Sequence, residues 1–106
     1  MPTIDTERDV LTLINTFQVP PERADELVSL LTQATEDVMQ HIDGFVSANI
    51  HRSLDGEVVT NYAQWRDKAA FDAMLEDDEA RVHMKKAAEL ATSYSPVLCT
   101  VVSSHG

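Results

Sequence analysis

Two residues able to hydrogen-bond a ligand stand four positions apart in one short stretch of the chain. Residues 58–65 are rich in β-branched and aromatic types and follow an Asp55-Gly56 pair, so we expect a β-strand after a tight turn. Side chains alternate across a strand, so Asn61 and Trp65 share one face and lie roughly 13 Å apart along it at about 3.3 Å per residue. On a buried face, an amide and an indole N–H each need a hydrogen-bond partner. We predict that a bound ligand supplies part of that need.

Other chemical groups are sparse. The chain has no glycine-rich phosphate loop, no nucleophile-elbow motif and no His/Cys spacing suited to zinc. We expect Cys99 to pack in the core, and Met74 and Met84 to pack or to line a pocket for a flat ligand, since thioethers are flexible. Among the histidines, His51 is the best candidate for a ligand contact. We expect surface or edge positions for all four: His41, His51, His83 and His105.

Strands and helices must position these residues. Hydrophobic periodicity predicts strands over 10–19, 45–52, 58–65 and 97–102, a helix over 21–41, and helical segments over 67–75 and 76–91. Gly44 is placed to end the long helix in a left-handed conformation, and Asp67 is placed to cap the next one. Pro96 should break the chain before the last strand. The first strand carries Asn15 on the same face as three apolar residues, Leu11, Leu13 and Phe17.

The element order is therefore β-α-β-β-α-β, which is typical of an α+β, ferredoxin-like fold with one antiparallel sheet and helices on one face. In that topology the first and third strands are adjacent at the centre, so Asn15 and Asn61 should be near neighbours. We expect a single domain over 10–103, a flexible arm over 1–9 and a tail over 104–106.

The opposite sheet face should also be apolar. Its predicted side chains could not all be left to water on a stable monomer, so we expect a homodimer in which two sheets pack face to face. The residues that suggest this are Ile14, Val46, Ile50, Val58, Thr60 and Tyr62.

Composition excludes several classes of partner. The 106 residues carry 18 acidic and 8 basic side chains, for a net charge of −10, so nucleic acid and anionic membranes should be repelled. No apolar run approaches the roughly 18 residues of a membrane span, and residues 1–9 lack the features of a signal peptide. A single cysteine permits no internal disulfide. We therefore expect a cytoplasmic protein with no nucleic-acid or membrane partner.

The run Asn61-Tyr62-Ala63-Gln64-Trp65 is followed by a helix carrying Phe71, and it is preceded by Asp43-Gly44-Phe45 and Asp55-Gly56. Over most of the chain these features resemble the antibiotic biosynthesis monooxygenase family, and within it the small quinone-forming enzymes. The resemblance implies a dimeric α+β barrel that oxidises an aromatic polyketide-like phenol, anthrone or quinol to a quinone with O2, without flavin, haem or metal.

The resemblance also implies roles for individual residues. Asn61 would donate a hydrogen bond to a substrate or peroxide oxygen, Trp65 would stack on or hydrogen-bond the substrate, and Asn15 would polarise a carbonyl. A tyrosine that assists proton transfer in the family falls on Phe71, which leaves the proton acceptor open. An arginine of the family falls near Lys85, with Arg81 as a second possibility. The remaining predicted substrate-binding residues are Met74, Met84 and His51.

Three alternative functions stay open. Phe71 in place of a tyrosine favours a non-catalytic protein that binds aromatic ligands, and a polyketide cyclase could use the same fold. Haem-degrading monooxygenases resemble the chain at Asn15 and Trp65. Their haem-ligating histidine, however, falls near Met84, with His83 one residue away, and their ring-distorting tryptophan falls on Met74.

Overall fold

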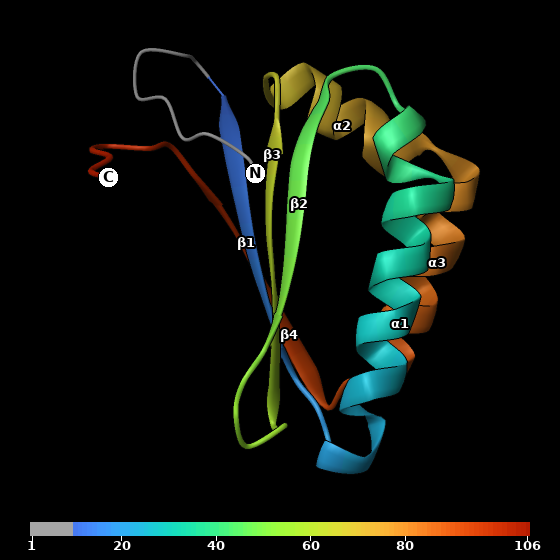
Figure 1. Cartoon of the computed structure of the whole chain (residues 1–106). Coiled ribbons are helices and arrows are strands. Elements are labelled where there is room, and N and C mark those ends of the chain that lie inside the picture. The colour runs from blue at the N-terminus through green and yellow to red at the C-terminus, as the bar shows by residue number, and fades with distance from the viewer. Residues whose placement is uncertain (1–9) are drawn as a thin grey trace.

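Four strands form one antiparallel sheet in the order β2-β3-β1-β4, in a computed structural model that describes residues 10–106. All helices lie on one side of the sheet, with α1 and α3 packed alongside each other (Figure 1). This confirms the α+β, ferredoxin-like fold, while the predicted arm over 1–9 lies outside the described residues. The elements are β1 (Leu11–Gln18), α1 (Pro21–Asp37), the 3₁₀ helix η1 (Met39–His41), β2 (Phe45–Arg52), β3 (Val58–Trp65), α2 (Lys68–Glu76), α3 (Asp78–Leu90) and β4 (Ser93–Cys99).

The central strands β1 and β3 bring the two predicted asparagines together. Asn15 lies directly opposite Asn61 in the antiparallel ladder, with Leu13 opposite Ala63 and Phe17 opposite Val59. The flanking apolar residues belong to the core beneath the helices, so this is the helix-facing side of the sheet. The prediction that the asparagines are neighbours is confirmed.

A β-bulge in β2 changes which side chains face the helices. The register shifts between Phe45, opposite Trp65, and Ser47, opposite Gln64. An extra residue on one strand reverses the alternation beyond it. Strict alternation along residues 45–52 would put Phe45 and Ser47 on the same face, and the bulge makes this wrong. Ile50 is corrected too: it lies opposite Asn61 and packs in the helix-side core, not on the outer face.

The helices begin and end through local hydrogen bonds. Asp67 and Asp77 cap α2 and α3, because their carboxylates accept from the N–H groups of Ala70 at 2.8 Å and Ala80 at 2.9 Å. Helix α1 ends at Asp37, earlier than predicted, and a 3₁₀ turn follows it. Gly44, at φ +90°, shapes the turn into β2 instead of ending the helix, and a Cβ there would overlap the Cβ of Ala70.

The last strand differs from its prediction. β4 starts at Ser93, includes Pro96 opposite Asn15, and ends at Cys99, whereas residues 100–106 have no regular secondary structure. As an edge strand, β4 has only β1 beside it, so a proline without an N–H is tolerated there. Cys99 is a free thiol at a half-buried position and not a core residue. The earlier start brings Tyr94 into the sheet.

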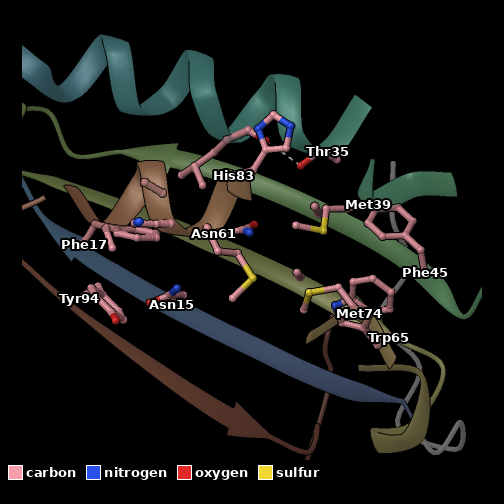
Figure 2. A pocket seen from close by; sticks show the side chains of 17 residues that line it. Asn15, Phe17, Thr35, Met39, Phe45, Asn61, Trp65, Met74, His83 and Tyr94 are labelled. Carbon is pink, nitrogen blue, oxygen red and sulfur yellow. Dashed lines mark hydrogen bonds between the residues drawn. The ribbon is translucent and has the colours of Figure 1, made fainter. Parts of the chain in front are cut away.

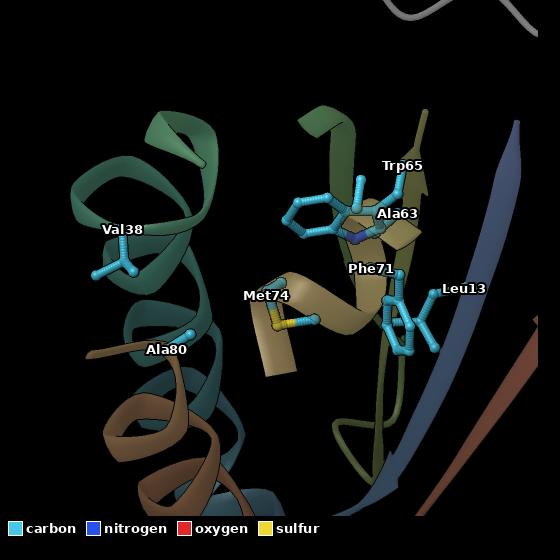
Figure 3. Packing of buried hydrophobic residues seen from close by; sticks show 8 residues of the cluster. Leu13, Val38, Ala63, Trp65, Phe71, Met74 and Ala80 are labelled. Atoms are coloured by element: carbon cyan, nitrogen blue, oxygen red, sulfur yellow. The ribbon is translucent and has the colours of Figure 1, made fainter. Parts of the chain in front are cut away.

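Buried apolar side chains form two clusters beneath the helices. One gathers around Trp65, Phe71 and Met74 (Figure 3), and the other around Leu27 and Val59. No helix in the described part of the chain is both long enough and apolar enough to cross a membrane. The separation of the two clusters matters, because a cavity lies between them.

Candidate active site

A cavity of about 340 Å³ lies between the sheet and the helices, within the size range of small-molecule sites. Its walls come from both core clusters and from every strand, and also from α1, η1, α2 and α3 (Figure 2). Most of the lining is apolar or aromatic. The polar side chains that line it are Asn15, Thr35, Asn61, His83, Lys85 and Tyr94.

The paired asparagines form the polar part of the sheet side. Both amide groups point into the space between the sheet and the helices (Figure 2). The Oδ1 atoms of Asn15 and Asn61 are buried and accept no hydrogen bond. Side chains directly opposite each other in a ladder have Cβ atoms about 4.5–5.5 Å apart, so both amides can reach one ligand group. Each orphaned acceptor costs about 1–3 kcal/mol, which a ligand that donates to it would recover.

Trp65 lines one end of the cavity and packs against Phe45. Its side chain is only 2% exposed, and the ring of Phe45 meets it edge-on with centroids 5.5 Å apart and an interplanar angle of 89°. The bulge in β2 makes this contact possible, because it turns Phe45 toward the helices. Edge-to-face aromatic pairs contribute about 0.5–1.5 kcal/mol beyond the area that they bury.

An exposed ion pair braces the turn next to Trp65. The Arg66 guanidinium donates to the Asp43 carboxylate at 3.1 Å, and the backbone N–H of Arg66 donates to the Gly44 carbonyl at 2.7 Å. The hydrogen bond from Arg66, followed by its charge, lowers the pKa of Asp43 from the ordinary 3.8. This bracing joins the end of β3 to the start of β2, where Trp65 and Phe45 meet.

The helix side of the cavity carries a histidine that sequence reasoning left on the surface. His83 of α3 lines the cavity, and its Nδ1 atom is buried without a partner. A signal for it exists in the sequence. His83 lies three residues after Ala80 and four before Ala87, both fully buried, and therefore on the apolar stripe of the helix. A further orphaned atom, Ser47 Oγ, belongs to the opposite face of the sheet.

The cavity opens between α3 and β4. Met84, Lys85 and Tyr94 line it and are exposed to solvent, whereas the other lining residues are buried or half-buried. Tyr94 packs against Phe17, with ring centroids 6.1 Å apart, while 54% of it stays exposed. An aromatic rim and a lysine ammonium therefore flank the entrance.

The structure brings six of the nine predicted site residues to this cavity: Asn15, Asn61, Trp65, Met74, Met84 and Lys85. The other three lie elsewhere. Phe71 is turned toward Leu13 and fills the core (Figure 3), because α2 presents Met74 to the cavity instead. His51 is exposed on the outer face opposite Thr60. Arg81 is exposed and borders a separate surface depression.

Within residues 10–106, no group of three or more His, Cys, Asp or Glu side chains is placed to hold a metal ion. The polar groups that line the cavity are two amides, one hydroxyl, one imidazole, one ammonium, a phenol and an indole, set in apolar walls.

Comparison with known proteins agrees with this geometry. The model of the antibiotic biosynthesis monooxygenase family matches residues 10–86. Tetracenomycin-F1 monooxygenase of Streptomyces glaucescens is 44% identical over 106 residues, which cover all of this chain and 94% of that protein.

Solved structures of two oxygenases share the fold of this chain. A monooxygenase from the gene ActVA-Orf6 of Streptomyces coelicolor, in complex with nanaomycin D, superposes with a TM-score of 0.81 at 27% identity, covering 93% of each chain. SnoaB, a cofactor-independent oxygenase from Streptomyces nogalater, shares the fold with a TM-score of 0.80 at 23% identity, covering 91% of this chain and 96% of its own. The chain belongs to the antibiotic biosynthesis monooxygenase family.

Proposed function

We propose that this protein is a cofactor-independent monooxygenase that oxidises an aromatic polyketide-like phenol or anthrone to a quinone with O2. The observation that carries the proposal is the Asn15–Asn61 pair, whose two unpartnered buried oxygens face one largely apolar cavity. A polycyclic phenol matches this site, because its rings suit the apolar walls and its hydroxyl and carbonyl groups suit paired amides.

The reaction needs no electron carrier beyond the substrate and O2. Removing a proton from the reacting CH2 group of an anthrone gives an electron-rich enolate, which passes one electron to O2. The resulting carbon radical and superoxide combine to form a C–O bond. The peroxide then loses water as its O–O bond breaks and the second C–H proton leaves. Overall, CH2 and O2 become C=O and H2O, so the protein has to position the substrate, accept and return its protons, and favour the developing charge.

Each side chain has a part in that scheme. The Oδ1 atoms of Asn15 and Asn61 accept from phenolic hydroxyls, and rotation of either amide offers Nδ2 to a carbonyl or enolate oxygen. Trp65 packs against the ring system. Lys85, at the entrance, favours the anionic enolate over the neutral substrate.

The relatives support the class of substrate. One relative, at 44% identity, is named for tetracenomycin F1, and a structural neighbour was solved with nanaomycin D. We take polycyclic compounds of this kind as the starting panel for activity tests, since a protein of similar fold binds one of them.

The decisive experiment measures O2 uptake and quinone formation by metal-stripped protein over a panel of anthrones and quinols. We expect one O2 consumed per quinone formed, and almost none with Asn61→Ala. Asn49→Ala is the matched control, because Asn49 is another strand asparagine that faces away from the cavity and donates to the Tyr62 carbonyl. A wild-type protein inactive over the whole panel contradicts the proposal.

The same panel separates the other functions. Quenching of Trp65 fluorescence without O2 uptake indicates a binding protein, and ring closure under anaerobic conditions indicates a cyclase. Haem added to the protein tests the haem-degrading alternative, because ligation by a histidine such as His83 would shift and sharpen the Soret band of free haem. Each of these outcomes replaces the proposed oxidation with a different function.

We also propose that the protein acts as a cytoplasmic homodimer. Free Cys99 is compatible with a reducing compartment. The outer face of the sheet carries half-buried Ile14, Val58 and Tyr62 beside Val97, which is 51% exposed, and a second sheet would cover them. Sedimentation should give twice the chain mass of 11.8 kDa at micromolar concentration. A chain mass that stays at the monomer value contradicts this part of the proposal.

A further inference from the structure

The cavity contains very few groups able to take a proton. Acidic side chains outnumber basic ones 18 to 8 in the chain, yet within residues 10–106 no aspartate or glutamate lines the cavity. The titratable side chains that do are His83 and Lys85 on α3 and Tyr94 on β4. From α1, η1, α2, β1, β2 and β3, only uncharged side chains face it.

Of these three side-chain types, only imidazole ordinarily carries a free lone pair on a large fraction of molecules near neutral pH. Lysine ammonium and tyrosine phenol groups ordinarily hold their protons there. Lys85 and Tyr94 also lie at the exposed entrance, whereas His83 is half-buried. The choice of proton acceptor therefore narrows to one residue.

The surroundings of His83 leave its ring nitrogen available. Nδ1 is buried and has no hydrogen-bond partner. On the facing helix α1, the Thr35 hydroxyl donates to the Leu31 carbonyl at 2.9 Å, so its proton is not offered to the imidazole. A buried nitrogen without a partner is costly unless a ligand engages it.

His83 and the asparagines stand on opposite walls. The imidazole belongs to the helix layer, and Asn15 and Asn61 belong to the sheet (Figure 2). A flat substrate whose oxygen atoms are held by the amides therefore lies with the rest of its ring system toward α3. A general base on α3 can then lie within hydrogen-bond distance of the reacting C–H group, directly or through one water molecule, as general-base catalysis requires.

We infer that His83 Nδ1 is the general base that removes the first proton from a substrate held by Asn15 and Asn61. This inference rests on the proposed oxidation, and it assigns the role that Phe71, turned away into the core, does not fill.

The protons balance through this one residue. Nδ1 takes a proton from the reacting carbon, which gives an imidazolium and the enolate. After electron transfer to O2 and formation of the C–O bond, the imidazolium returns that proton to the distal peroxide oxygen. Nδ1 then accepts the second C–H proton as the O–O bond breaks, and it passes that proton to the departing hydroxide to give water. His83 ends neutral, ready for another turnover.

The test compares His83→Gln with wild type and with His41→Gln, a matched control at an exposed histidine on η1. A missing general base lowers kcat at neutral pH by about 10²–10⁴-fold. The deficit should shrink by about tenfold per pH unit on raising the pH, as the substrate ionises without help. Added imidazole should restore part of the activity of His83→Ala. His41→Gln should follow the wild-type profile.

Binding and folding are measured alongside. Quenching of Trp65 by the quinone product and the melting temperature should stay near wild type in His83→Gln, with His83→Asn as a second variant. If wild type oxidises anthrones and His83→Gln keeps its rate and pH profile, the inference fails while the proposed function stands. A deficit that neither alkali nor imidazole reduces also overturns it, because that marks a positioning role. Inactive wild-type protein instead overturns the proposed function itself.

Discussion

Two polar pairs on the same two strands differ in their hydrogen bonding: one is satisfied within the protein and the other is not. Thr12 lies opposite Gln64 and Asn15 lies opposite Asn61, in a single β1–β3 ladder. On the outer face, Gln64 Nε2 donates to Thr12 Oγ1 at 3.3 Å, and the two residues are 1% and 2% exposed. On the helix face, the asparagine oxygens are buried and accept nothing.

The difference separates structure from ligand binding. A polar pair that satisfies itself contributes to folding, because its lost water contacts are replaced within the protein. A pair left open lowers stability by about 1–3 kcal/mol per buried orphaned atom. Such a cost is tolerated at functional sites, where a ligand completes the hydrogen bonds. Mutations in the two pairs should therefore act on different properties.

The largest effect is expected from Asn61→Ala. Removing one preorganised amide at the point where charge develops should lower kcat/KM by about 10²–10³-fold. The free energy of unfolding should change little, because the variant also removes an orphaned buried oxygen. Steady-state oxidation and urea unfolding measure the two quantities on one preparation. The opposite result would be an Asn61→Ala protein that is mostly unfolded but whose folded fraction is fully active. It would show that Asn61 serves stability and not catalysis.

The next effect should appear in stability alone. Gln64→Leu leaves the Thr12 hydroxyl without its donor in a buried position, which should lower the free energy of unfolding by about 1–3 kcal/mol. The substituted side chain points away from the cavity, so kcat/KM should stay within about threefold of wild type. Loss of activity larger than the loss of folded protein would show that the outer pair also serves the site.

A smaller effect should be seen in product affinity. Asn15→Ala leaves Asn61 able to accept from the ligand, so the Kd for a quinol or quinone should rise by only about tenfold, near 1.4 kcal/mol. Titrations that follow Trp65 fluorescence measure this change. Thr12→Val is the control, because it disrupts the closed pair and should leave the Kd unaltered. Equal Kd values for wild type and Asn15→Ala would mean that Asn61 alone holds the ligand.

Much of this contrast could be predicted from the sequence. Alternation along residues 10–19 and 58–65, together with the topology, places Asn15 beside Asn61, because both rules depend only on local geometry and chain connectivity. The cavity position of His83 could also be predicted, because the residue lies on the apolar stripe of its helix. Its spacing of three and four residues from Ala80 and Ala87 indicates an inward-facing side chain, whereas the general preference of histidine for the surface predicts the opposite.

Other features depend on contacts that no local pattern encodes. One extra residue after Phe45 turns its ring onto Trp65, and alternation cannot detect a one-residue bulge. Whether Phe71 or Met74 faces the cavity depends on how α2 is rotated, which the close approach of Ala70 to Gly44 helps to determine. Pro96 is compatible with a strand only because β4 has a single neighbour.

The smallest effect concerns a third polar pair, which is exposed and should alter neither property strongly. The hydrogen bond and charge of Arg66 lower the pKa of Asp43 below 3.8, so the pair contributes stability that is present above that value and is lost as the pH falls through the lowered pKa. Asp43→Asn should therefore be slightly less stable than wild type at pH 7, and the gap should close in strong acid. Urea unfolding at pH 7 and at low pH measures it, while NMR titration reports the carboxyl directly. A gap that persists after Asp43 is protonated would mean that the side chain supports the turn before Phe45 through shape and not through charge.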